Sequence, residues 1–159
     1  MNKTKIMTQG ALIAALYVVL TFLVNMAGLA SGVVQLRLSE ALCVLTAFTP
    51  AAIPGLFVGC LLANMLTGCL ALDVIFGGLA TLIGAIGGWM LRKKNGFIIS
   101  IPTIIANTLI VPFILRFVYG STDTMIFMFI TVFIGELISA GVLGSILHSE
   151  LIKRKNIFK

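Results

Sequence analysis

Charged side chains are scarce in this chain of 159 residues. Aspartate, glutamate, lysine and arginine together make up 10% of the sequence, hydrophobic residues make up 60%, and the mean hydropathy is +1.17. A water-soluble domain of this size cannot bury so much apolar surface in its core. The composition therefore excludes a soluble globular protein and indicates an integral membrane protein.

The sequence also lacks the signatures of catalysis, nucleotide hydrolysis and metal binding. It holds one histidine and neither an HExxH motif nor a phosphate-binding or ATP-binding loop. The cysteines, Cys43, Cys60 and Cys69, show no CxxC spacing, so we expect them to pack as apolar side chains. We expect no enzyme activity, no metal and no cofactor, and any energy for transport must come from an ion gradient or from separate ATPase subunits.

Six apolar segments follow one another along the chain, at residues 7–27, 39–49, 52–70, 73–91, 97–118 and 123–152. They predict an all-α membrane protein with six transmembrane helices in one domain, 1–159. The second segment is short and is followed by Pro50 and Pro54, so we expect it to pack within the bundle or to form a tilted pair with the third. The first segment is too long for a cleaved secretory signal and is interpreted as a retained helix.

Basic residues indicate the orientation of these segments. Nine of them, at positions 3, 5, 92, 93, 94, 153, 154, 155 and 159, fall on the side of both termini, and only Arg37 and Arg116 fall on the other side. The positive-inside rule then places both termini in the cytoplasm. Topology accounts for the net charge of +6, so nucleic-acid binding is not expected. Trp89 and His148 are expected at the inner interface.

Polar side chains within the segments collect toward the outer half of the membrane. The residues concerned are Asn25, Glu40, Asn64, Asp73, Asn107 and Glu136. Glu136 lies near the middle of an apolar run at 125–147, where a carboxylate costs at least about 2.5 kcal/mol unless it is paired, hydrated or protonated. No lysine or arginine is expected at its depth. We therefore predict a polar cup that opens outward and is closed below by apolar packing.

Several of these residues also have a purely structural interpretation. Asp73 could be a helix N-cap, and Glu40 could lie in a first helical turn while pairing with Arg37. The three asparagines could form hydrogen bonds between helices. Glu136 could be a protonated structural acid.

Small residues recur at four-residue spacing and predict close helix packing. The rows at 55, 59 and 63, at 80, 84 and 88, and at 140 and 144 are expected inside the bundle. The row of Ala11 and Ala15, widened by Gly10 and Ala14, is the candidate docking face for another membrane subunit.

Three motifs, QLRLSEAL at 35–42, LDVIFG at 72–77 and GEL at 135–137, can be compared with a known family. Together with chain length and segment number, they resemble the queuosine-precursor transporter family, the substrate-binding S components of energy-coupling factor (ECF) transporters. The resemblance implies a six-helix bundle of the ECF S-component type in a prokaryotic plasma membrane. It also implies a 7-deazaguanine ligand, a transmembrane coupling subunit docked on Ala11 and Ala15, and two cytoplasmic ATPase subunits.

Such a ligand fits the polar residues. Glu136 can accept the adjacent N1–H and 2-amino donors of a guanine-like edge, and Asn107 can donate to its O6 carbonyl. A positively charged substituent suits Glu40 or Asp73. The set of expected substrate-binding residues is Glu136, Asn107, Glu40, Asp73, Asn64 and Arg37. Phe48 and Phe57 are candidates for ring stacking, and residues 28–38 are expected to act as a lid.

Two other functions stay open. One is an S component for another small solute, such as a vitamin or tryptophan, and the other is a structural membrane protein without a ligand. The chain shows no inverted repeat, which does not favour a self-sufficient carrier.

Overall fold

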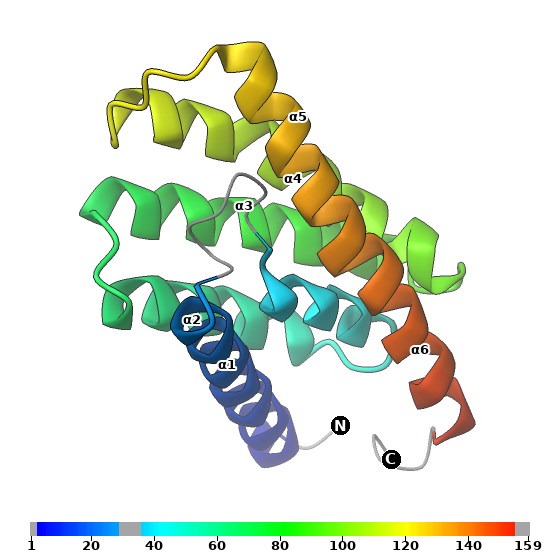
Figure 1. Ribbon diagram of the computed structural model, residues 1–159. Coiled ribbons are helices and arrows are strands. Elements are labelled where there is room, and N and C mark those ends of the chain that lie inside the picture. The colour runs from blue at the N-terminus through cyan, green and yellow to red at the C-terminus, as the bar shows by residue number, and fades with distance from the viewer. Residues whose placement is uncertain (1–2, 29–35, 155–159) are drawn as a thin grey trace.

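The computed structural model describes residues 3–28 and 36–154, and all regular structure in these residues is helical. The α-helices are α1 (Lys3–Met26), α2 (Ala52–Leu66), α3 (Ala71–Met90), α4 (Gly96–Phe117), α5 (Met125–Glu136) and α6 (Gly144–Lys153). A 3₁₀ helix, η1 (Leu38–Ala47), precedes α2, and a π-helical segment, η2 (Leu137–Leu143), joins α5 to α6 into one continuous rod (Figure 1).

In the part of the chain that the structure describes, four helices are long and apolar enough to cross a membrane, namely α1, α3, α4 and the rod at Met125–Lys153. By contrast, η1 has 10 residues and α2 has 15. At about 2.0 Å and 1.5 Å per residue, each rises only roughly 20 Å, short of the roughly 30 Å hydrocarbon layer. The expectation of six full spans is therefore not confirmed by helix length. The third segment ends four residues earlier than expected, because the chain turns at Gly68, whose φ is 79°.

The short helix η1 is the centre of the bundle. It touches α1, α2, α3, α4, α6 and η2, and its residues 39–46 are all buried. Around it, α1 to α4 pack in chain order, each against the next, and α4 also packs on α5. The prediction that the second segment packs within the bundle is confirmed. The start of α1 and the end of α6 lie at the same end of the molecule (Figure 1).

Glycines bring the helices together, as predicted. A Cβ at Gly55 would lie 2.7 Å from the carbonyl oxygen of Gly10, and a Cβ at Gly59 would lie 2.8 Å from the Cβ of Tyr17. In the same way, a Cβ at Gly84 would lie 2.5 Å from the hydroxyl oxygen of Thr103. These positions therefore need glycine, because a side chain would push α2 away from α1 and α4 away from α3.

One expectation about α1 is wrong. Gly10 and Ala14 do not widen an outer docking row, because both are buried on the side of α1 that faces α2. Ala11 and Ala15 are exposed on the helix surface. The two pairs of small residues thus lie on different faces of the helix.

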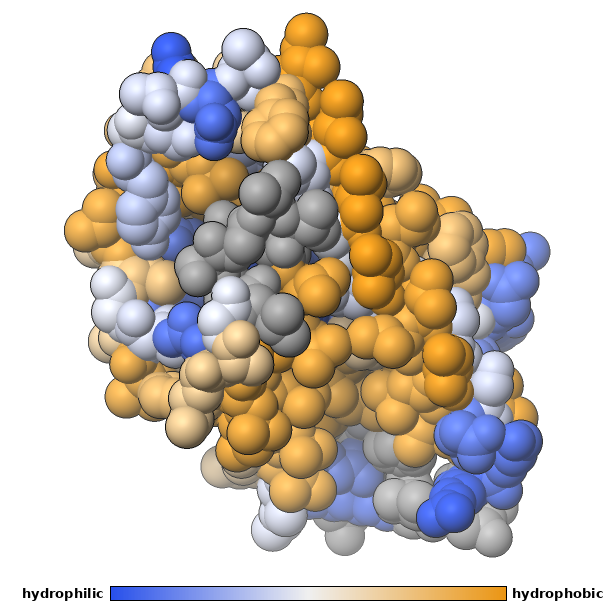
Figure 2. All heavy atoms as spheres, viewed as in Figure 1, coloured by the Kyte–Doolittle hydropathy of each residue, from blue (hydrophilic) through white to orange (hydrophobic). Residues whose placement is uncertain are grey.

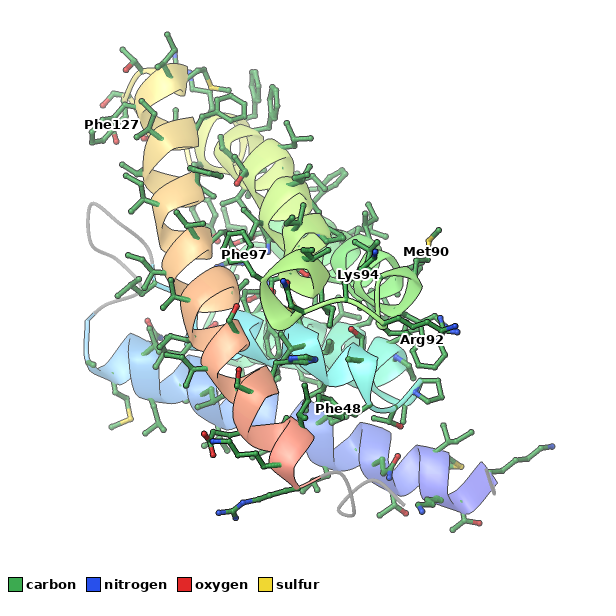
Figure 3. All side chains as sticks on the ribbon, turned by 90° about the vertical axis from the view of Figure 1, so that its right-hand side faces the viewer. Phe48, Met90, Arg92, Lys94, Phe97 and Phe127 are labelled. Atoms are coloured by element: carbon green, nitrogen blue, oxygen red, sulfur yellow. The ribbon has the colours of Figure 1, made fainter. Side chains whose placement is uncertain are left out.

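The visible surface is hydrophobic across the middle and hydrophilic toward its ends (Figure 2). Large apolar side chains are exposed on every long helix, up to 84% for Met26. Arg92 lies over the Trp89 ring, 4.3 Å from its centroid. In Figure 3, Arg92 and Lys94 lie far from Phe127, which marks the other end of the bundle. This arrangement is typical of a membrane-embedded bundle with interfacial anchors.

Candidate ligand-binding site

A cavity of about 510 Å³ is lined on α1 by residues 17–25, the half of the helix away from its start. The ends of α1 and α4, the turn after α2, the start of α3 and the chain entering η1 form its wall. Its polar lining includes Tyr17, Asn25, Arg37, Asn64, Asp73 and Tyr119. Four of the residues singled out in the sequence thus share one cavity, whereas Glu40, Asn107 and Glu136 do not line it.

Asp73 is held at the cavity mouth by Tyr119. The Tyr119 hydroxyl donates to Asp73 Oδ2 at 2.6 Å, and the Leu70 backbone N–H donates to the same hydroxyl at 3.3 Å. Burial, followed by the hydrogen bond to Asp73, raises the pKa of Tyr119, so its hydroxyl remains a donor at neutral pH. Asp73 is not the N-cap of α3, because Leu70 occupies that position and Asp73 lies in the first turn.

Asn64 lies beside Asp73. A Cβ at Gly77 would be 3.0 Å from Asn64 Nδ2 and 3.5 Å from Asp73 Oδ1, so this glycine makes room for both side chains. Asn64 donates to Cys60 Sγ of its own helix at 3.7 Å. Among the described hydrogen bonds, Asn64 does not donate to another helix.

Glu40 is buried, with 1% of its surface exposed. Its Oε1 accepts hydrogen bonds from the Tyr17 hydroxyl at 2.5 Å and from the Thr81 hydroxyl at 3.5 Å. It lies in the first turn of η1, as one interpretation expected, but it forms no ion pair with Arg37. Within residues 3–28 and 36–154, the ion pair that forms joins Lys153 to Glu150 at 2.7 Å.

Glu136 and Asn107 form a second buried pair. Glu136 is 3% exposed and is the last residue of α5, where the helix changes to the π-helical segment η2. Asn107 is fully buried on α4, and its amide faces the carboxylates of both Glu40 and Glu136. Asn107 Nδ2, Asn107 Oδ1 and Glu136 Oε2 have no hydrogen-bond partner in the described part of the chain. Burying a polar atom without a hydrogen bond lowers the stability of the fold, so each of these three atoms requires an explanation.

We call Glu40, Asn107 and Glu136 the buried polar layer. Tyr17 connects this layer to the cavity, because it lines the cavity and donates to Glu40. Arg37 is the second connection. Its charge acts on Glu40, Asp73 and Glu136, although the sequence analysis placed no cation near Glu136. Its backbone N–H also donates to Ser139 Oγ of η2 at 3.2 Å.

The sequence analysis missed Tyr17, Tyr119 and Thr81. A signal was available for Tyr17, because it lies in the first apolar segment and a buried phenol needs a hydrogen-bond partner. The sequence analysis also expected the cup to be closed on its inner side by apolar packing. The packing there is not purely apolar, because it contains the buried hydroxyl groups of Thr46, Ser100 and Thr103.

The phenylalanines proposed for ring stacking lie elsewhere. Phe48 packs against His148, with ring centroids 5.4 Å apart, and Phe57 packs near Gly78 on α3. His148 is 6% exposed and lies within the bundle instead of at the interface. The aromatic rings that line the cavity are Tyr17 and Tyr119. Most of the expected lid, residues 29–35, lies outside the described residues, so the lid stays a prediction.

Comparison with known proteins identifies the family of this chain. The sequence model of the QueT transporter family matches residues 7–153. A curated relative, the queuosine precursor transporter QueT of Lactococcus lactis subsp. cremoris (strain MG1363), is 37% identical over 82 residues. That match covers 52% of this chain and 48% of the relative, so it spans about half the length of the relative. No solved structure matches. The family match extends over nearly the whole chain and confirms the resemblance seen in the motifs, and this helical membrane protein therefore belongs to the QueT transporter family.

Proposed function

We propose that this chain captures a 7-deazaguanine compound, either a queuosine precursor or a salvage form, as the substrate-binding component of an ECF-type importer. The candidate ligands are queuine, aminomethyl-deazaguanine and queuosine. The observation that carries the proposal is the buried polar layer, whose unpartnered atoms lie below a cavity that opens at one end of the bundle. The name of the curated relative supports the ligand class.

The ligand supplies the donors that the buried layer lacks. A guanine-like edge presents N1–H and a 2-amino hydrogen side by side, and a carboxylate accepts both at once. Glu136 is the proposed acceptor, because its Oε2 has no partner among the described residues. Glu40 is already engaged by Tyr17 and Thr81, so Asp73 is the better site for a positively charged substituent. Asn64 and Arg37 complete the proposed site in the cavity wall.

Substitution of Glu136 tests this function. Glu136→Gln keeps the side-chain shape but replaces one acceptor oxygen with a donor, so we expect binding of queuine to the purified chain to weaken by at least about tenfold. Glu150→Gln is the control, because Glu150 is an exposed acid on the same rod that pairs with Lys153. Normal binding by Glu136→Gln at equal expression would support a structural acid instead.

A competition assay tests the ligand class. Guanine-like bases should displace bound queuine, whereas thiamin and tryptophan should not. Displacement by a vitamin or by tryptophan would assign the chain to another small solute.

The proposed partners are a transmembrane coupling subunit and two cytoplasmic ATPase subunits, with both termini of this chain in the cytoplasm of a prokaryote. The exposed pair Ala11 and Ala15 on α1 is the proposed docking face. We expect Ala15→Leu to retain ligand binding and to lose ATP-dependent uptake, because a larger side chain prevents close helix approach. Leu12→Val, an exposed change one turn away, is the control. Uptake by the chain alone in liposomes would contradict this arrangement.

A further inference from the structure

The orientation of the Asn107 amide follows from its neighbours. A carboxylate only accepts hydrogen bonds, whereas an amide has an NH₂ group that donates and an oxygen that accepts. Two carboxylates, Glu40 from η1 and Glu136 from the end of α5, face this amide. The amide therefore turns its NH₂ toward them. Its Oδ1 is left as an acceptor, without a donor in the described part of the chain.

Two hydrogen bonds to Glu40 help to hold the Asn107 amide in this orientation. Tyr17 on α1 and Thr81 on α3 both donate to Glu40 Oε1, which fixes the carboxylate that faces Asn107. The charge of Arg37 acts on Glu40 and Glu136 and offsets the repulsion between them. Three atoms of the buried polar layer have no hydrogen-bond partner among the described residues. Asn107 Nδ2 is the donor that is turned toward the carboxylates, and Glu136 Oε2 and Asn107 Oδ1 are the two acceptors left for a ligand.

Resting on the proposed function, we infer that Asn107 determines specificity by accepting a hydrogen bond from the exocyclic amino group of the ligand. A 2-aminopyrimidinone edge carries three donor hydrogens on adjacent nitrogens. N1–H and one amino hydrogen point to Glu136, and the second amino hydrogen points to Asn107 Oδ1. This acceptor role replaces the O6 donor role expected from the sequence.

The inference predicts discrimination by the amino group. A ring that lacks this group leaves Asn107 Oδ1 buried and unpaired, and a site built to bind a donor rejects such an analogue. We expect the purified full-length chain in nanodiscs to bind 7-deazaguanine about 10- to 100-fold more tightly than 7-deazahypoxanthine, which lacks the amino group. Tryptophan serves as the unrelated ligand.

Two variants test the residues involved. Asn107→Leu keeps the number and branching of the side-chain heavy atoms and removes the acceptor, so binding of 7-deazaguanine should fall while binding of 7-deazahypoxanthine changes by less than about threefold. Tyr17→Phe keeps the ring but removes the hydroxyl that donates to Glu40 Oε1, so it should reduce the preference between the two ligands without abolishing binding. Thr108→Val is the matched control, since Thr108 is the neighbour of Asn107 on α4 and its buried hydroxyl has no partner among the described residues.

The outcomes separate the inference from the proposed function. Equal binding of both deazapurines by the unmodified chain overturns the inference and leaves a deazapurine-binding protein. Equal losses for both ligands in Asn107→Leu also overturn it, because they indicate a packing role. Binding of neither deazapurine by the unmodified chain contradicts the proposed function itself. If Asn107→Leu fails to fold, the preference of the unmodified chain and its reduction in Tyr17→Phe still decide the question.

Discussion

At the scale of single residues, the hydroxyl of Tyr119 links two segments of the cavity wall. It donates to Asp73 on α3, while Tyr119 itself follows the end of α4. A hydrogen bond to a charged group contributes about 1.5–3 kcal/mol, and we expect the lower part of that range because Tyr119 is 44% exposed. Tyr119→Phe should therefore lower the free energy of unfolding in detergent by about 1.5 kcal/mol.

The pH dependence of this difference follows from the raised pKa of Tyr119. A group whose pKa is raised on folding contributes fully below its unfolded value, about 10 for tyrosine, and loses the contribution as pH rises through the folded value. The difference between the unmodified chain and Tyr119→Phe should therefore be constant from about pH 6 to 9. Thermal unfolding across this range is the measurement, with Phe117→Leu as the control. A difference that disappears by pH 8 would contradict the assignment.

Residue chemistry explains why part of the site was predictable. The burial of Glu136 was predictable from sequence, because depth in the hydrocarbon follows from segment length and sets the cost of a carboxylate. The grouping of Asn64 with Asp73 was only partly predictable, since it depends on Gly77 leaving space between them. Tyr17 and Thr81 were missed because their partner, Glu40, lies on a segment far away in the sequence.

At the scale of elements, the π-helical segment η2 sets the position of Glu136 relative to Ser139. A π-helical turn contains one residue more than an α-helical turn and is frequent at functional sites. Deletion of Val142, a half-exposed residue of η2, should restore α-helical geometry and break the contact between Arg37 N–H and Ser139 Oγ.

We expect the Val142 deletion to fold and to bind ligand at least about tenfold more weakly. The reason is that the position of Glu136 relative to Ser139 changes when the π-helical turn after Glu136 becomes α-helical. Ligand titration and thermal unfolding of the same sample measure both properties. Val142→Ala is the control. Unchanged affinity in the deletion variant would show that η2 is not needed to position the acid.

The contact of α1 with α2 gives a second prediction at this scale. A methyl group at Gly59 would lie 2.8 Å from the Cβ of Tyr17 and 3.0 Å from the Cα of Ala14, so the helices must move apart. Gly59→Ala should lower the free energy of unfolding by about 1–3 kcal/mol. Gly10→Ala is the matched control in the same interface, since its methyl group would come no closer than 3.4 Å to the chain. Equal effects of the two changes would contradict this account.

Element lengths show where sequence reasoning stops. The spans at α1, α3, α4 and the rod were predictable, because each is a long apolar run. The 3₁₀ geometry of η1 and the end of α2 at Leu66 were not, because tertiary contacts and the turn at Gly68 determine them. The central position of η1 depends on contacts with six other elements, which no local pattern encodes.

At the scale of the whole molecule, orientation is testable by cysteine labelling. With Cys43, Cys60 and Cys69 replaced, Thr122→Cys should react with a membrane-impermeant thiol reagent in intact cells. Ser149→Cys should react only after the cells are permeabilised, because Arg92, Lys93 and Lys94 mark its end of the bundle as the cytoplasmic side. The reverse pattern would place the cavity on the cytoplasmic side and contradict capture from outside.

The short length of α2 has a consequence for the surrounding lipid. The outer face of α2 carries the exposed apolar side chains of Val58, Leu62 and Met65. Lipid hydrocarbon chains must therefore cover a helix of only 15 residues. A helix shorter than the hydrocarbon layer thins the bilayer beside it, at a cost that rises with each ångström of mismatch. Because α2 packs against α1, this thinned annulus adjoins the surface of Ala11 and Ala15. A partner helix that displaced those lipids would relieve the deformation, and its association should therefore strengthen in vesicles made from longer-chain phospholipids.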